Sequence, residues 1–589
     1  MHNGLIKRKQ FSNAEFFFTQ KLLELFNYAT LDTYRVKYNN PKTIIEEFCQ
    51  VLTDWHKNKI KDFKTVTSVS DELSRLIKKD KNLKFIRISK NSFLQICITS
   101  KEENYMQAYY ASKVLLSENV NYIEGLYLDI LRIINELNSS VQFELDKLED
   151  LNDLIGYLAS ELHGNGYSKA YLFHISWSLF GKFTNHTFVE SFEMLKTITL
   201  NKKMEAFKVY LRVKFSNTEP QILKLKIFEF LNEEEIKLLH DKSKDFRKFY
   251  NDRRKDFPDT LCFDVKSLDY YNATKLAKAK VSEILDIYKI GYSNRSLRIF
   301  TQALLVSESN PDKFELQGTF YQIEGKVEKS EELYEKFLTR YLSVRGNDKI
   351  ALETKEKIKS AIRYFRLGTE AVELEQKFIN YWIGIEYLFS SYDAQTSTFV
   401  RFKTYFSRLH SLTYLKRNLI EFHSDIKRIN FESNIINFNE DLQYLLDPNT
   451  FKSIAENGAE SQPLLSFRAN AFYSIMTEDK KFKKYIQDHI ENIEAHLIRI
   501  YRIRNEIVHE AAIKPNIENL TSNLRYYLIY TISMLLDFFS TPSTEISIDD
   551  LISIDDFFIY KTLEYSNFLN SKNNQKDMFN NTYVENIVY

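Results

Sequence analysis

The chain has 589 residues, and its 81 Lys and Arg residues almost balance its 80 Asp and Glu residues. This length exceeds one ordinary hydrophobic core and predicts about two to four domains. The charge balance excludes a polycation, so any contact with nucleic acid has to come from a local patch. The chain holds 13 glycines, where an average composition would give roughly 40. Few turn-forming residues predict long elements and a mainly helical fold.

The three cysteines, Cys49, Cys97 and Cys262, lie far apart and lack any paired-ligand spacing. This pattern argues against a disulfide framework or a zinc site and suits a reducing cytoplasm. The first residues form no apolar stretch typical of a signal peptide, and no window approaches the roughly 18 apolar residues of a membrane span. We therefore expect a soluble cytoplasmic protein with no membrane contact, no metal and no cofactor.

Residues 1–345 are predicted to form an α+β region in which helices predominate, divided into two subdomains. Apolar and polar residues alternate, as in strands, in three segments. These segments are KFIRIS (84–89), FLQICIT (93–99) and KVYLRVKF (208–215). The segment LKLKIFEF (223–230) is expected to be the second arm of a hairpin with 208–215. Helical spacing predicts helices over 107–138, 272–290 and 329–343.

From about residue 350 the pattern is that of long helices alone. Residues 350–540 are therefore predicted to form a helical bundle, with an irregular insertion near 440–465. Its predicted helices cover 355–373, 377–391, 398–430, 465–475, 480–512 and 518–539. The tail, 541–589, contains the acidic and weakly amphipathic stretch ISIDDLISIDDF (546–557). We expect that stretch to dock on the bundle rather than to recruit a partner.

The stretch IRIYRIRNEIVHE (498–510) places polar residues among apolar ones on a single predicted helix. Residues three, four and seven apart share a helix face. Arg502, Asn505 and His509 therefore form one polar strip. Arg504 instead falls within the apolar stripe, a costly place for an unpaired guanidinium. Glu386 occupies a matching position in the apolar stripe of 377–391, so we predict an ion pair between Glu386 and Arg504.

The run Tyr501–His509 resembles the RNxxxH form of the Arg-x4–6-His motif of HEPN domains. Its flanks, an aromatic before the arginine pair and IVHE at the end, are most similar to the Apea-like HEPN family of antiphage defence proteins. KFINYWIGIEYLF also resembles the first long helix of that family. The resemblance covers about 355–540 and implies a HEPN helical bundle.

The resemblance implies a metal-independent endoribonuclease. In that chemistry the 2′-hydroxyl attacks the neighbouring phosphorus and leaves a 2′,3′-cyclic phosphate. An imidazole, whose ordinary pKa is about 6.5, suits the proton transfers, and a guanidinium suits the phosphoryl oxygens. His509 would be the acid/base, Arg504 the motif arginine and Asn505 the orienting residue. Arg502 lies on the side of His509, whereas Arg504 lies about 140° away around the helix, so Arg502, with Arg499, is a second candidate for phosphate binding.

Each motif supplies one histidine, whereas the reaction needs an acid and a base. HEPN sites are typically composite, so a homodimer through the bundle is implied. A second match, Arg417-Asn418 to His423, would let a monomer suffice, but one such match is expected by chance among 11 histidines. We interpret it as a basic helix surface, because residues 401–428 have a local charge of about +5. The alternative function is a non-catalytic HEPN module for RNA binding or assembly.

The expected partner is RNA, and the family suggests tRNA. Uncontrolled cleavage would harm the host, so we expect the N-terminal region to restrain the nuclease until it senses a phage-derived activator. The sequence contains no P-loop, HExxH motif or nucleophile elbow that would support an NTPase, a metalloprotease or a hydrolase of that class.

Overall fold

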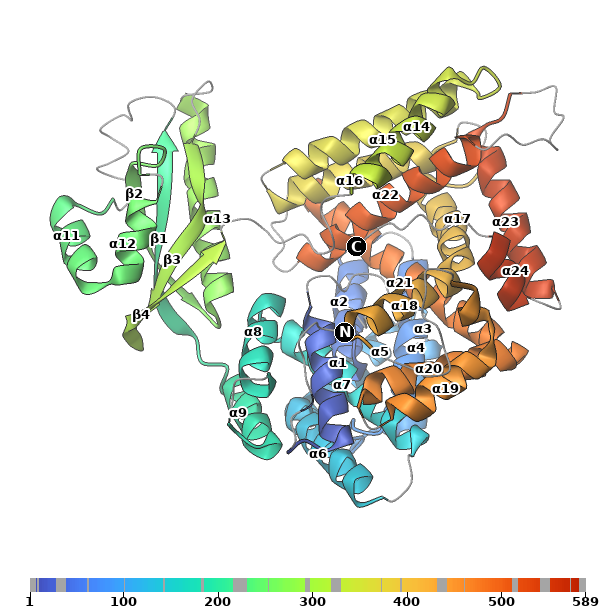
Figure 1. The fold of residues 1–589 in the computed structure, drawn as a ribbon, viewed down its shortest axis with the longest axis horizontal. Helices are drawn as coiled ribbons and strands as arrows, with labels where there is room; N and C mark the ends of the chain where they lie inside the picture. Colours follow the sequence, from blue (N-terminus) through green and yellow to red (C-terminus); the bar gives the residue numbers. More distant parts are fainter. Residues whose placement is uncertain are drawn as a thin grey trace. The chain divides into compact units, whose positions relative to one another are not determined.

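Figure 1 shows the computed structural model of the chain, which is mainly helical with one small antiparallel sheet. This confirms the predicted fold class, mainly α with an α+β region. The structure describes the chain except for residues 1–6, 8–9, 28–38, 61–62, 100, 141–143, 182–184, 216–229, 253, 292–296, 319–329, 372, 392–394, 432–441, 460, 511–516, 541–550, 572–573 and 582–589. In the part described, no helix has both the length and the apolarity needed to cross a membrane.

The chain forms two compact units. Unit 1 combines Met1–Glu161 with Ile323–Tyr589, and unit 2 is the insert Leu162–Gln322. The sequence predicted two subdomains within residues 1–345, followed by a separate bundle over 350–540 and a tail over 541–589. The helices before residue 162 belong instead with the C-terminal helices, because they pack on one another. For example, Phe17 and Phe467 meet edge to face with their ring centroids 5.4 Å apart.

The N-terminal part of unit 1 is entirely helical in its described residues. Its helices are α1 (Asn13–Phe26), α2 (Pro41–His56), α3 (Lys64–Lys79), α4 (Lys90–Ile98), α5 (Tyr105–Glu118), α6 (Tyr122–Ser139) and α7 (Leu145–Gly164), which leads into unit 2. Helix α2 packs on both α3 and α5, and α1 packs on α20 of the C-terminal part.

The C-terminal part of unit 1 is a helical assembly around one large apolar core. Its elements are α14 (Glu331–Gly346), α15 (Leu352–Glu370), α16 (Leu374–Phe389), α17 (Thr398–Leu412), α18 (Tyr414–Arg428), the short 3-10 helix η1 (Leu442–Leu446), α19 (Pro448–Gly458), α20 (Pro463–Thr477), α21 (Asp479–Glu510), α22 (Glu518–Ser540), α23 (Ile554–Asn570) and α24 (Asn574–Asn581). Trp382 of α16 and Leu528 of α22 lie in that core.

Unit 2 has a four-stranded antiparallel sheet in the order β2-β1-β3-β4. The elements of unit 2 that follow α7 are α8 (Lys169–Phe180), α9 (Phe188–Asn201), β1 (Glu205–Phe215), α11 (Glu233–Lys242), α12 (Lys244–Asn251), β2 (Asp259–Ser267), α13 (Tyr270–Gly291), β3 (Leu297–Ser307) and β4 (Asn310–Gly318). Side chains alternate along β1, so Val209 and Leu211 pack with α13 while Tyr210 packs with α12 on the opposite face. Both faces of the sheet are therefore covered by helices, as Figure 1 shows.

Most predicted helices are present, but two predicted strands are wrong. Residues 84–89 have no regular secondary structure, and 93–98 lie in α4. The Glu118 carboxylate accepts the backbone N–H groups of Ile86 and Arg87, so this segment needs no strand partner. Ser89 caps the helix that follows by accepting from the backbone N–H of Ser92. Short apolar runs do not separate strand from helix by periodicity alone.

The predicted strand 208–215 is confirmed within β1. Its expected hairpin partner, 223–230, lies outside the described residues apart from Phe230. Strand β1 pairs with β2 along one edge and β3 along the other, and Phe230 forms an isolated bridge with Leu261 of β2.

The tail docks on the bundle in its described part, as expected. Ile552 pairs with Ile350 in a short bridge, and Ile554, Phe557 and Phe558 enter the core of the C-terminal assembly. The irregular insertion expected near 440–465 instead contains η1 and α19, because Asp447 caps α19 and Pro448 occupies its first position.

Candidate functional site

The motif lies at the C-terminal end of α21, a helix of 32 residues. Ile493, Leu497 and Ile500 of its apolar stripe are buried in the bundle core. One residue later, the Tyr501 ring stacks on that of Phe399 in α17, with centroids 4.1 Å apart and an interplanar angle of 12°. These contacts fix the rotation of α21 about its axis and so decide where each motif side chain points.

The predicted ion pair between Glu386 and Arg504 is present. Arg504 Nη2 lies 3.5 Å from Glu386 Oε1, and Arg504 Nη1 donates to Asn505 Oδ1 at 3.1 Å. The expected deep burial is wrong, because the Arg504 and Glu386 side chains are 23 % and 34 % exposed. The pair lies at the rim of the bundle, where α21 leaves the core. A partly solvated pair of this kind contributes orientation more than stability.

Helix α16 holds Glu386 in place through a close helix contact. A Cβ atom added to Gly384 would lie 2.8 Å from Leu528 Cδ2 of α22. The glycine therefore allows α16 and α22 to approach more closely than any larger residue would. The neighbouring Trp382 is almost fully buried, packs near Tyr501 and links α16 to α21.

Arg499 and Arg502 point to the N-terminal helices α2 and α3. Arg499 Nε donates to both oxygens of Glu47, at 2.8 and 3.1 Å, and Arg499 Nη2 pairs with Glu72. Arg502 Nη2 donates to Glu47 Oε1 at 2.7 Å. Glu506 also lies near Arg502, with 3.9 Å between Oε1 and Nε. The two arginines expected to bind phosphate are therefore occupied by carboxylates.

The electrostatics of Glu47 follow from these contacts. Burial would raise the pKa of its carboxyl, but the charges of Arg499 and Arg502 and hydrogen bonds from Arg499 and Asn39 outweigh it and lower the pKa to about 2. The Glu47 side chain is 9 % exposed and the Arg499 side chain 4 %. Glu47 thus stays ionised at any physiological pH.

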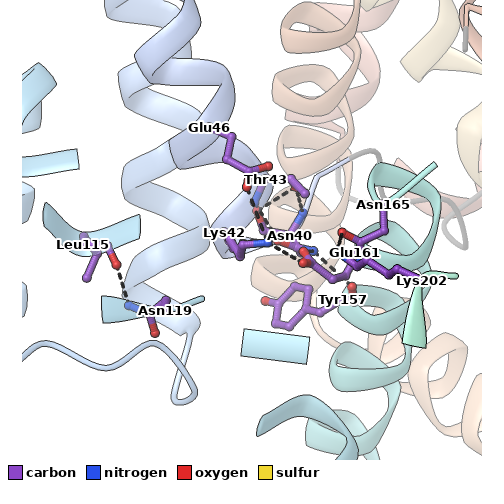
Figure 2. A network of polar contacts seen from close by, with 10 residues as sticks. All are labelled: Asn40, Lys42, Thr43, Glu46, Leu115, Asn119, Tyr157, Glu161, Asn165 and Lys202. Carbon is purple, nitrogen blue, oxygen red and sulfur yellow. Dashed lines mark hydrogen bonds and ion pairs between the residues drawn. The ribbon is translucent and has the colours of Figure 1, made fainter. Parts of the chain in front are cut away.

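A polar network anchors the start of α2, as Figure 2 shows. Asn40 caps the helix by accepting from the backbone N–H groups of Lys42 and Thr43, and its amide donates to Tyr157 O and Glu161 Oε2 of α7. Lys42 Nζ also lies 2.5 Å from Glu161 Oε1. This cap fixes the helix that presents Glu47 to α21.

His509 lies one turn beyond these contacts and is exposed. Arg504, Asn505 and Glu386 form one contact group, and Arg499, Arg502 and the two glutamates form another. Among the residues described, none forms a hydrogen bond or an ion pair with His509. A single chain therefore carries on α21 the exposed imidazole of His509 and the guanidinium of Arg504, which Glu386 holds in place.

The second motif match was expected on a basic helix surface, and this is wrong. Arg417, Asn418 and His423 are all less than 9 % exposed. Arg417 donates to Tyr526 Oη at 3.0 Å and to the His410 carbonyl at 3.0 Å, and His423 Nδ1 lies 2.6 Å from Tyr444 Oη. Neighbouring residues cover α18 and form hydrogen bonds with its polar side chains. The positive charge of this segment therefore did not predict its exposure.

Sequence reasoning missed Glu47 and Glu72, which lie more than 400 positions from the motif. A signal for Glu47 exists in α2: it lies three residues after Ile44 and four before Val51, both fully buried. That is the same anomaly, an acid beside an apolar stripe, that identified Glu386. What the sequence lacks is any indication of which arginine would meet it.

Comparison with protein-family models, with curated proteins and with solved structures found no match to this chain. Within the described part of the chain, no group of three or more His, Cys, Asp or Glu side chains is arranged to hold a metal ion.

Proposed function

We propose that this chain is a HEPN-type endoribonuclease that cleaves RNA without a metal, with His509 as acid/base and Arg504 as the phosphate-facing cation. The observation that supports this proposal is the Glu386–Arg504–Asn505 contact at the same end of α21 as the exposed His509. Glu386 and Asn505 restrict the guanidinium, and a restricted guanidinium loses less entropy when it binds phosphoryl oxygens. The resemblance of this run to the HEPN motif supplies the reaction class.

The proposed reaction forms one bond and breaks one. The 2′-oxygen of the RNA attacks the adjacent phosphorus while a base accepts its proton, and the bond from phosphorus to the 5′-oxygen breaks. An acid protonates the 5′-oxygen as it leaves, so the products are a 2′,3′-cyclic phosphate and a 5′-hydroxyl. Negative charge accumulates on the phosphoryl oxygens, where Arg504 would stabilise it.

One exposed histidine serves either as the base or as the acid, so the proposal includes a homodimer in which each chain supplies one. The buried environment of His423 supports this view, because the second match in the chain is not open to an RNA strand. We place the activity in the bacterial cytoplasm, in antiphage defence, with tRNA as the first RNA class to assay.

The test is RNA cleavage by the purified full chain in buffer containing EDTA, with products analysed for 2′,3′-cyclic phosphate ends. His509→Ala should lower the cleavage rate by about 10²–10⁴-fold, as expected when a general acid or base is lost. Arg504→Ala should also abolish cleavage, with little change in thermal stability because the pair with Glu386 is partly solvated. Size-exclusion chromatography with light scattering measures whether the active species is a dimer.

His186→Ala is a matched control, because His186 is also an exposed histidine but lies in unit 2. It should cleave RNA at the wild-type rate. Expression of the wild type should arrest bacterial growth, and His509→Ala should relieve the arrest. If the wild type and His509→Ala both bind RNA and neither cleaves it, the nuclease proposal is wrong and a non-catalytic RNA-binding module is the better interpretation. Equal cleavage by the two proteins would show that His509 is not the acid/base.

A further inference from the structure

Helices α2 and α3 meet the motif helix α21 through a row of ion pairs. Glu47 of α2 bridges Arg499 and Arg502, at 2.8 and 2.7 Å, and Glu72 of α3 pairs with Arg499. Closer to the N-terminus of α21, Glu491 pairs with Arg75 of α3. Each acid of α2 and α3 in this row faces an arginine of the candidate site.

These contacts lie on the helix face that leads to His509. At 100° per residue, Arg502 lies about 20° around α21 from Glu491, and His509 lies at about 0°. Helix α3 reaches this face at Glu491, and α2 reaches it at Arg502. An RNA strand that approaches His509 along this face therefore meets helices α2 and α3, which carry Glu47 and Glu72.

A carboxylate and a phosphate are interchangeable partners for a guanidinium. Both accept guanidinium N–H groups through anionic oxygens. Glu47 accepts from Arg499 Nε with both of its oxygens and from Arg502 Nη2 with one of them. Arg502 Nη1 is buried and makes no hydrogen bond with any described group. Each phosphodiester of an RNA strand carries two anionic oxygens, and Arg502 Nη1 is a donor left for one of them.

We propose that Glu47 and Glu72 form an autoinhibitory carboxylate pair, which occupies the backbone-phosphate positions of Arg499 and Arg502 until RNA or an activator displaces it. This inference rests on the proposed ribonuclease function. The contact of Glu47 and Glu72 with the arginines is what would hold the ribonuclease inactive. Glu47 lies between Arg499 and Arg502, and Glu72 pairs with Arg499, in a largely buried interface, so the resting state is stable. Exchange for RNA phosphates keeps both arginines paired, so release leaves no buried guanidinium uncompensated.

The first experiment measures binding of a fluorescent 20-nucleotide oligouridylate by anisotropy. The variants carry His509→Ala, so that the probe stays intact. Adding Glu47→Gln and Glu72→Gln should tighten the Kd by at least about tenfold, since the arginines then lack a competing anion. Adding Arg499→Gln and Arg502→Gln to that variant should remove the gain.

Glu24→Gln is the matched control. Glu24 is another buried acid of the N-terminal helices, and it pairs with Arg468 of α20 in the same unit. Its loss should lower thermal stability, as the loss of Glu47 does, but should leave the Kd for the oligonucleotide unchanged. Circular dichroism and thermal unfolding of each variant identify any that fail to fold.

A second experiment needs no change at the glutamates. Hydrogen exchange of the His509→Ala chain is measured with and without saturating oligouridylate. Backbone amides of α2 and α3 should exchange faster in the presence of RNA, while those of α1 should not change. Protection of α2 and α3 by RNA, or no change in them, would contradict displacement.

The outcomes separate this inference from the proposed function. Tighter binding by the glutamine variant together with faster cleavage when His509 is intact supports both. Tighter binding without cleavage supports the carboxylate pair and overturns the nuclease proposal. Cleavage that depends on His509 but is unchanged by the glutamines, with an unchanged Kd, overturns the carboxylate pair and leaves the nuclease proposal standing.

Discussion

Two glutamates beside apolar helix stripes, Glu47 and Glu386, bind three arginines of α21. The two contacts differ in burial. Glu386 lies at the bundle rim and orients Arg504, whereas Glu47 is nearly enclosed and neutralises Arg499 and Arg502. Removing a rim partner costs little, but removing a buried one leaves an uncompensated charge. A glutamate–arginine ion pair therefore orients Arg504 in one contact, and in the other it occupies the guanidinium groups of Arg499 and Arg502.

The free energy of unfolding at acid pH depends on the protonation of His423. Burial, together with the charge of Lys427, lowers the pKa of its imidazole below the ordinary value of 6.5. The unfolded chain then binds a proton that the folded chain does not, so His423 lowers the free energy of unfolding as pH falls below 6.5. We expect the Tm to decrease between pH 7.5 and 5.5, and to decrease less in His423→Gln.

Tyr444→Phe is the control for this prediction, because it removes the hydrogen-bond partner of His423 but keeps the buried imidazole. Its Tm should retain the wild-type slope with pH. An identical pH slope in wild type and His423→Gln would show that His423 does not titrate in this range.

At the scale of elements, the position of the site depends on how closely the helices of the bundle approach one another. Gly384 brings α16 against α22, and Gly368 of α15 lies where a Cβ atom would overlap the Tyr381 ring. Both glycines lie in helix interiors, where glycine is usually unfavourable. Their presence there reflects packing, because α15, α16 and α22 share one core with α21.

Gly384→Leu should destabilise the protein by about 1–3 kcal/mol, as overpacking of a filled core does. Moving α16 outward also shifts Glu386 away from Arg504, so RNA cleavage should fall as well. Gly125→Leu in α6 is the matched control, since a Cβ atom there meets nothing within 4 Å. Chemical denaturation of both variants measures the difference, and equal stabilities would contradict the packing argument.

At the scale of the whole molecule, unit 1 is built from two segments distant in sequence. Arg468 of α20 bonds to Glu24 of α1 and to Asp425 of α18, and all three side chains are at most 3 % exposed. Gln20 of α1 also lies 2.7 Å from Gln462. These buried polar contacts tie the N-terminal helices to the C-terminal assembly, so neither segment completes its core alone.

A fragment of residues 346–589, cut at the boundary that the sequence suggests, should therefore unfold with low cooperativity and bind the dye ANS. It lacks Glu24, so the buried Arg468 loses one of its two carboxylates, and the apolar face against α1 is exposed. Co-expression with residues 1–161 should restore a cooperative transition. A fragment with the Tm of the full chain would show that the two segments fold independently.

Features that depend on local spacing could be predicted from the sequence. Most helices and the strand 208–215 follow from periodicity, whereas Asn505, which the spacing groups with Arg502 and His509, bonds to Arg504. The Glu386–Arg504 pair was also predictable, because two anomalies on neighbouring helices of one bundle have few other ways to be neutralised. Periodicity failed at 84–99, where side-chain caps rather than strand partners satisfy the backbone.

The sequence could not predict which side chains of distant segments meet. Nothing local indicates that Glu47 and Glu72 reach Arg499 and Arg502, or that Arg417 and His423 are enclosed while His509 remains exposed. Burial and charge pairing depend on contacts between segments hundreds of residues apart, and helical spacing carries no information about them. The motif residues can therefore be recognised in the sequence. That Arg499 and Arg502 form ion pairs with Glu47 and Glu72 is a property of the folded chain.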